Sequence, residues 1–113
     1  MSSMDLDKDR KIAQTLRLAW PAFFQSFGRL TDVQRQAIPE IYQGQEILIC
    51  SQTASGKTEA VCAPLVQRYV SLRNEWTILY ICPTRALVND LYYRLEVPLH
   101  RMGITLMRRT GDH

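Results

Sequence analysis

The sequence predicts an α/β fold in which a parallel β-sheet is flanked by helices. Three short apolar runs with the composition of β-strands, at 46–51, 76–82 and 104–109, alternate with segments of helical periodicity. Connections between parallel strands place helices on both faces of the sheet, so such strands are apolar along nearly their whole length. The chain has 113 residues, 46% of them hydrophobic and 22% charged. This length and composition indicate one small globular domain and exclude a disordered or collagen-like chain.

Helical periodicity and capping residues locate the helices. Apolar residues recur at three- and four-residue intervals, which predicts a short helical piece after Pro21 and helices at 11–20, 31–42, 58–70 and 84–98. Thr31 and Thr84 are of the residue type that caps helix N-termini, and Gly44 is expected to stop the helix that begins at Thr31. Pro98 and Gly103 are expected to end the last helix.

The formal net charge is +3, from 14 basic and 11 acidic residues. This excess is too small to indicate a nucleic-acid partner by itself. Its distribution is uneven, because the residues from 84 to 113 include five arginines: Arg85, Arg94, Arg101, Arg108 and Arg109. A phosphate-binding surface and a solvated helix face explain this bias equally well.

The apolar runs and the cysteines indicate where in the cell the protein is expected. No apolar run approaches the roughly 20 residues that span a bilayer, and the N-terminus lacks the apolar segment of a secretory signal, so we expect no membrane partner. Cys50, Cys62 and Cys82 form an odd number without a C-x-x-C spacing. Two of them lie in apolar runs, which predicts buried free thiols and a cytoplasmic protein.

The segment Ser51–Thr58 reads S-Q-T-A-S-G-K-T and lies between a predicted strand and a predicted helix. Gly56, Lys57 and Thr58 match the end of the phosphate-loop pattern G-x-x-x-x-G-K-[ST], whereas Ser51 replaces its first glycine. Backbone N–H groups and the helix dipole favour phosphate at such a helix start, where Lys57 would reach the β- and γ-phosphates and Thr58 would ligate Mg²⁺. The alternative is an ordinary strand-to-helix turn in which Gly-Lys-Thr occurs by chance. The position of the segment, after a predicted strand and before a predicted helix, disfavours this alternative.

With this loop, several motifs in order resemble the start of the first RecA-like domain of superfamily 2 helicases of the DEAD/DEAH-box type. The resemblance runs from about 30 to 112. The run 30–34, L-T-D-V-Q, resembles the Q motif, 51–58 resembles motif I and 83–87, P-T-R-A-L, resembles motif Ia. The Thr-Gly-Asp at 110–112 favours the large-helicase-related branch. We therefore expect a helical N-terminal extension at 1–29 and, at 30–113, an incomplete RecA-like phosphate-loop NTPase domain that stops before motif II.

The resemblance implies roles for residues on both sides of the predicted phosphate loop. It implies that Gln34 reads the edge of adenine, and that an upstream aromatic residue, one of Phe23, Phe24 or Phe27 if any, stacks on the base. It implies catalytic roles for Lys57 and Thr58, with Thr58 as the Mg²⁺ ligand. The implied ATP-binding residues are Gln34, Ser51, Thr53, Ala54, Ser55, Gly56, Lys57, Thr58 and Glu59. Single-strand backbone contacts with nucleic acid are implied for Thr84, Arg85, Gly111 and Asp112.

These patterns predict the ATP-binding portion of an ATP-dependent helicase or translocase acting on RNA or DNA. The alternatives are a non-catalytic module that binds nucleotide or nucleic acid, and a double-stranded DNA translocase of the restriction type. The sequence contains no adjacent Asp-Glu pair, which motif II supplies in this family, so we expect these 113 residues to turn over ATP negligibly. A sheet that lacks the motif II strand would leave unpaired edges, which predicts self-association if the chain is a truncated fragment.

Overall fold

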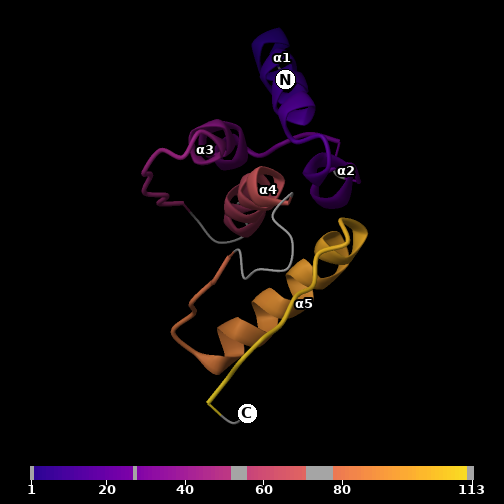
Figure 1. The fold of residues 1–113 in the computed structure, drawn as a ribbon. Helices are drawn as coiled ribbons and strands as arrows, with labels where there is room; N and C mark the ends of the chain where they lie inside the picture. The colour runs from indigo at the N-terminus through magenta and orange to yellow at the C-terminus, as the bar shows by residue number, and fades with distance from the viewer. Residues whose placement is uncertain (1, 27, 52–55, 71–77, 112–113) are drawn as a thin grey trace.

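The computed structural model describes residues 2–26, 28–51, 56–70 and 78–111. Five helices lie in these ranges (Figure 1): α1 Ser3–Thr15, α2 Ala19–Phe23, α3 Asp32–Tyr42, α4 Lys57–Tyr69 and α5 Arg85–Arg101. In Figure 1, α2, α3 and α4 lie together in the middle, α1 projects at one end and α5 crosses the other end. No described helix is long and apolar enough to cross a membrane.

The three predicted segments from Thr31 onward do form helices, and side-chain caps explain where α3 and α5 begin. The Thr31 hydroxyl accepts from the Gln34 N–H group, and the Thr84 hydroxyl accepts from the Leu87 N–H group. The prediction that Pro98 helps to end α5 is wrong, because the helix continues through it to Arg101. Proline removes one backbone donor from the helix, and the burial of Leu99 in the core holds the turn that follows it.

The N-terminal helix differs from the predicted segment 11–20. Helix α1 begins at Ser3, where the Ser2 hydroxyl accepts from the Asp5 N–H group, and it ends at Thr15. A new helix, α2, starts at Ala19 because a distant side chain satisfies its first donors: Gln67 Oε1 accepts from the N–H groups of Leu18 and Ala19 at 2.8 and 3.0 Å. Local periodicity carries no information about that contact, since Gln67 is 48 residues further along the chain.

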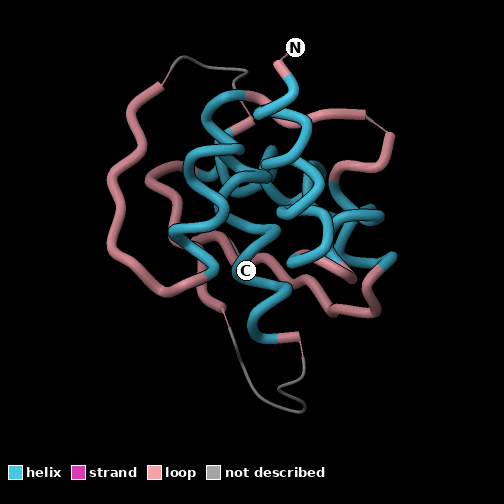
Figure 2. The backbone as a smooth tube through the Cα atoms, turned by 90° about the horizontal axis from the view of Figure 1, so that it is seen from above, coloured by secondary structure: helices cyan, strands magenta, loops and turns pink. Residues whose placement is uncertain are grey.

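No β-strand is present in the described residues, so the predicted parallel sheet is not observed (Figure 2). The runs 46–51 and 104–109 are irregular, as are the described residues 78–82 of the third run. A strand needs a neighbour for its backbone N–H and C=O groups, and a parallel strand is buried on both faces. Here Leu48, Leu79 and Ile81 are 80 to 89% exposed, so these segments have the composition of strands without the burial of strands.

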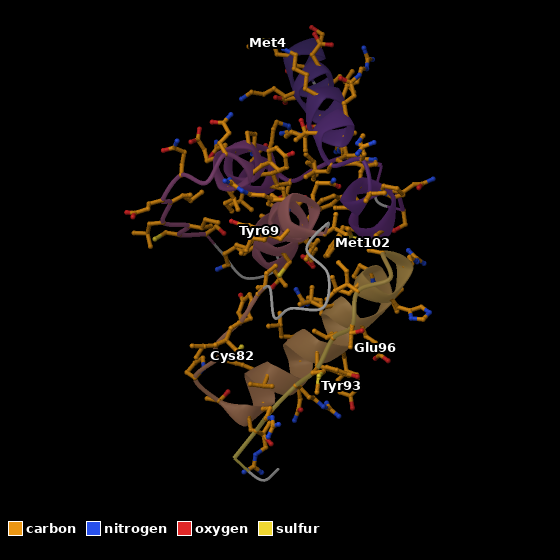
Figure 3. All side chains as sticks on the ribbon, viewed as in Figure 1. Met4, Tyr69, Cys82, Tyr93, Glu96 and Met102 are labelled. Carbon is orange, nitrogen blue, oxygen red and sulfur yellow. The ribbon has the colours of Figure 1, made fainter. Side chains whose placement is uncertain are left out.

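One hydrophobic core joins all five helices, and α4 lies at its centre. Leu16, Ala19 and Ala63 are completely buried, and Phe24 and Ile38 are almost so. Leu95 and Leu99 bring α5 to the same core, and Met102, just beyond α5, packs against its edge (Figure 3). The core therefore consists of helix-to-helix contacts, which hold the starts of α3 and α4 close to each other.

The cysteines are free, but the expectation of burial is only partly correct. Cys62, on α4, is buried, whereas Cys82 is half-buried and Cys50 is exposed. Cys50 is exposed because its apolar run lies outside the core instead of in a sheet.

Candidate nucleotide and nucleic-acid sites

Gly56 begins α4 in a conformation that favours glycine. Its φ is +82°, in the left-handed region, and a Cβ atom there would overlap the side-chain amide of Gln34. No side chain caps this helix start within the described residues. The first-turn N–H groups of α4, together with the helix dipole, therefore form a place that favours an anion such as phosphate.

Gln34 lies in the first turn of α3 and reaches the start of α4. Its Oε1 accepts from the Thr31 N–H group at 2.9 Å, and its N–H group donates to the Thr31 hydroxyl at 3.3 Å, which is a capping box. Its Nε2 donates to the Gly56 carbonyl at 3.2 Å. Two residues that are 22 positions apart, and that the sequence assigned to one site, are thus in direct contact.

Lys57 and Thr58 are half-buried in the first turn of α4. Lys57 Nζ donates to the Ser51 carbonyl at 2.8 Å, so this hydrogen bond joins the two described ends of the predicted phosphate loop. The structure therefore groups Gln34, Ser51, Gly56, Lys57 and Thr58. The other predicted loop residues, Thr53, Ala54 and Ser55, lie outside the described residues.

Glu59 faces away from this group, toward α5. Its Oε1 lies 3.8 Å from Nη1 of Arg94, so the two helices that begin at the predicted binding motifs are joined by an ion pair. The pair is partly exposed, and pairs of this kind contribute at most about 1 kcal/mol to stability.

Cys62 lies one turn further along α4. Burial raises the pKa of its thiol to about 12, and the charge of Glu59 is the smaller cause of this rise.

Two of the three candidate aromatic partners of adenine, Phe23 and Phe24, are buried in the core. Phe23 and Phe24 are 4% and 1% exposed in the core, and the rings of Phe24 and Trp20 are 5.3 Å apart between centroids. A ring without an exposed face cannot stack on a base, so neither phenylalanine is available to adenine. Phe27 lies outside the described residues.

A second feature is a pocket of about 400 Å³ at the start of α5. Thr84 and Arg85 contribute to it from the helix start, and the segment that follows α5 contributes Arg109 and Gly111. Its full lining is Cys82, Pro83, Thr84, Arg85, Val88, Arg109, Thr110 and Gly111. Three of the four predicted nucleic-acid residues thus share one pocket, while Asp112 lies outside the described residues.

Arg108 holds the C-terminal segment against α5, a role that no sequence motif indicates. Its guanidinium lies 4.4 and 5.2 Å from the ring centroids of Tyr92 and Tyr93, and its Nη1 donates to Asn89 Oδ1 at 3.0 Å. Tyr93 points outward from α5 in Figure 3. Arg108 therefore places the next residue, Arg109, at the pocket.

Sequence reasoning missed a buried ion pair beside Gln34. Arg35 Nε donates to Asp9 Oδ1 at 2.6 Å, and Arg35 Nη2 donates to Asp9 Oδ2 at 3.1 Å. This hydrogen bond is the main cause that raises the pKa of Arg35, against the opposing effect of burial. The two residues are 26 positions apart on different helices, so no local pattern indicates the pair.

Comparison with known proteins identifies the family. A family model described as DEAD/DEAH box helicase matches residues 31–113, which is most of the chain. The chain belongs to the DEAD/DEAH box helicase family. This membership implies a RecA-like α/β fold, of which the described residues show helices and no strand. The match begins at the cap of α3, so α1 and α2 lie outside it.

Named relatives agree with this assignment. The chain is 37% identical over 97 residues to ATP-dependent helicase Lhr-Core protein 2 of Thermococcus barophilus, covering 74% of this chain and 11% of the relative. It is 39% identical over 83 residues to ATP-dependent helicase Lhr-Core of Methanocaldococcus jannaschii, covering 68% and 10%. With DEAD-box ATP-dependent RNA helicase CshC of Bacillus cereus the identity is 33%, covering 72% and 20%.

The chain spans a tenth to a fifth of the length of these curated relatives. No solved structure matches it. The matched residues correspond to the N-terminal part of a helicase domain, and both Lhr-Core and DEAD-box helicases are among the similar proteins, in keeping with the predicted family.

Proposed function

We propose that residues 31–113 bind ATP and a nucleic-acid strand as part of an ATP-dependent helicase or translocase. In the complete protein, ATP hydrolysis would be coupled to movement along RNA or DNA. The observation that carries the proposal is the contact between Gln34 and Gly56, because it joins the amide that would read the base to the helix start that would bind phosphate. Membership in the helicase family supports the same activity.

At the nucleotide site, the triphosphate would lie at the start of α4. Lys57 would exchange its present acceptor, the Ser51 carbonyl, for the β- and γ-phosphates, since an ammonium group prefers the more negative oxygen. The Gln34 amide uses one N–H and one oxygen lone pair in its contacts with Gly56 and Thr31, so its second N–H and second lone pair would serve the adenine edge.

A Mg²⁺ ion would neutralise phosphate charge at this site. The donor set fits such an ion in part: the Thr58 hydroxyl is a hard oxygen ligand next to Lys57, and Mg²⁺ usually keeps water and phosphate oxygens as its other ligands. No group of three or more His, Cys, Asp or Glu side chains within the described ranges could hold a metal ion. Thr58 would therefore be the principal side-chain contribution from this part of the chain.

The pocket at the start of α5 would bind the sugar-phosphate backbone. Arg85 and Arg109 supply positive charge, and the helix start near Thr84 supplies backbone donors. Gly111 leaves room for close approach of a strand. Contacts of this kind place a strand without reading its bases, so they suit a protein that moves along many sequences.

Binding without turnover is a second candidate function for these residues. Within these 113 residues no Asp-Glu pair is available to position the attacking water, so binding is the part of the reaction that this stretch can perform by itself. We expect the 113-residue chain to bind ATP with negligible hydrolysis, as a module whose chemistry needs further residues.

Nucleotide titration by calorimetry tests the proposal. We expect an ATP analogue with Mg²⁺ to bind the wild-type chain, and Lys57→Ala to weaken binding at least tenfold, because about 1.4 kcal/mol of charge-assisted contact is lost. Lys8→Ala, on the exposed side of α1, is the matched control and should bind like wild type. Equal affinity in wild type and Lys57→Ala, or no binding to wild type, would contradict the proposal.

A further inference from the structure

Asp9 and Arg35 bind both backbone groups of Leu30, the first residue of the Q motif. The two parallel N–H···O bonds between the side chains leave Asp9 Oδ2 able to accept also from the Leu30 N–H group, at 3.4 Å. Arg35 Nη2 donates to the Leu30 carbonyl at 3.1 Å. Both polar groups of Leu30, which is itself 4% exposed, are therefore bound by one ion pair.

The ion pair is buried, unlike the other carboxylates near it. Asp9 and Arg35 are 8% and 7% exposed. Arg35 Nη1 also lies 3.0 Å from Asp32 Oδ1 and 3.9 Å from Asp5 Oδ2. The side chains of Asp32 and Asp5 are 93% and 40% exposed. A buried charge pair is a weak source of stability because both charges lose their hydration, but its fork geometry fixes orientation closely.

The backbone of Leu30 is linked to Gln34 through the next residue, Thr31. Leu30 precedes Thr31, whose N–H group donates to Gln34 Oε1, and this bond sets the plane of the Gln34 amide. The same amide donates through Nε2 to Gly56. A shift of the backbone at Leu30 would move the Thr31 donor and release the amide from its present orientation.

We propose that Asp9 is a positioning residue for Gln34, and that α1 is thereby part of the nucleotide site. The inference rests on the proposed ATP-binding function. Asp9 acts through Arg35 and Leu30 and touches no nucleotide itself. Because Asp9 lies outside the residues that match the family, base selectivity in this chain depends on an added helix. Detachment of α1 should lower the preference for adenine more than it lowers affinity for the triphosphate.

Selectivity between ATP and GTP analogues tests this inference. Asp9→Asn keeps the shape of the side chain and removes its charge. We expect it to reduce the ratio of the two affinities at least about fivefold, a loss of roughly 1 kcal/mol in discrimination. Leu99→Ala, a buried substitution in α5 remote from Asp9, should lower stability and leave the ratio unchanged. If Asp9→Asn does not fold, Arg35→Lys serves instead, because an ammonium group keeps the charge but cannot form the fork.

Hydrogen exchange tests the same inference without a nucleotide. In Asp9→Asn, or in Arg35→Lys in its place, the N–H groups of Thr31 and Gln34 should exchange at least about fivefold faster relative to that of Leu87, which has the corresponding cap on α5. Equal acceleration at all three groups, or none, would overturn the positioning role, as would an unchanged affinity ratio. If the wild-type chain does not distinguish the two nucleotides, the proposed base recognition fails, and the exchange result still decides whether Asp9 positions Gln34.

Discussion

Two separate requirements favour glycine at Gly56. The positive φ would strain any other L-residue, and the side-chain amide of Gln34 occupies the space of a Cβ atom. Gly28 has nearly the same φ, +81°, but no atom lies within 4 Å of a Cβ placed there. A comparison of Gly56 with Gly28 therefore separates the effect of backbone strain from that of side-chain overlap.

We expect Gly56→Ala to lower the free energy of unfolding by more than Gly28→Ala does. Left-handed strain should cost about 1 kcal/mol in both variants, and displacement of the Gln34 amide should add about another 1 kcal/mol in Gly56→Ala alone. Urea unfolding measures both values. Equal losses in the two variants would mean that Gln34 moves aside at little cost.

The Cys62 thiol predicts a specific pH dependence. Because burial raises its pKa from 9.0 to about 12, the unfolded chain loses this proton before the folded chain does. The free energy of unfolding should therefore fall as the pH rises from about 9 to 12, with no contribution from this group below that window. Unfolding at several pH values should show a shallower fall in Cys62→Ala than in wild type.

At the level of elements, α4 organises the ends of its neighbours as well as the core. Gln67 satisfies the first N–H groups of α2, and Arg68 Nη1 donates to the Tyr42 carbonyl, at the end of α3, at 2.7 Å. Two adjacent residues on α4 thus each satisfy backbone groups at one end of another helix. This explains why α2 and α3 lie close to the helix that starts at the predicted phosphate loop.

The cap of α5 serves structure, and in our proposal it also serves binding. We expect Thr84→Ala to lower the free energy of unfolding by about 1 kcal/mol, because the Leu87 N–H group loses its acceptor. Binding of single-stranded RNA or DNA should weaken as well, since the helix start loses order. Thr84→Ser retains the hydroxyl and should retain both properties, measured by urea unfolding and fluorescence anisotropy. A Thr84→Ser variant as unstable as Thr84→Ala would show that the methyl group, and not the cap, matters.

For the whole molecule, the exposed apolar segments are the main departure from a compact domain. The radius of gyration is 14.3 Å, compared with about 13 Å for a compact chain of this length. Leu48 and Leu79, in the runs 46–51 and 76–82, are 89% and 82% exposed. Exposed apolar side chains of this kind are typical of surfaces that associate with another chain.

We therefore expect the isolated chain to self-associate. Sedimentation should show a weight-average mass that rises with concentration, and the double substitution Leu48→Lys with Leu79→Lys should shift the distribution toward monomer. Leu6→Lys, at a half-exposed leucine on α1, is the control and should behave like wild type. A wild-type chain that stays monomeric at high concentration would contradict this prediction.

Local patterns were sufficient for much of the fold and for part of the site. The caps Thr31 and Thr84 predicted the starts of α3 and α5, because a capping hydroxyl acts within three residues. The grouping of Gln34 with the end of the loop also followed from motif order. The helix boundary at 15–19 did not, because Gln67 decides it, and the phenylalanines could not be assigned until their burial was known.

The sequence by itself indicated the family and the positions of the main helices, and it predicted the residues of a phosphate loop, because each of these patterns depends on neighbours along the chain. Only the tertiary structure decided the burial of Asp9 against Arg35, the overlap of Gln34 with Gly56 and the absence of strands in the described residues. The physical reason is that ion pairs, close contacts and strand pairing need partners that are distant in sequence. Whether a partner is present is a property of the folded chain.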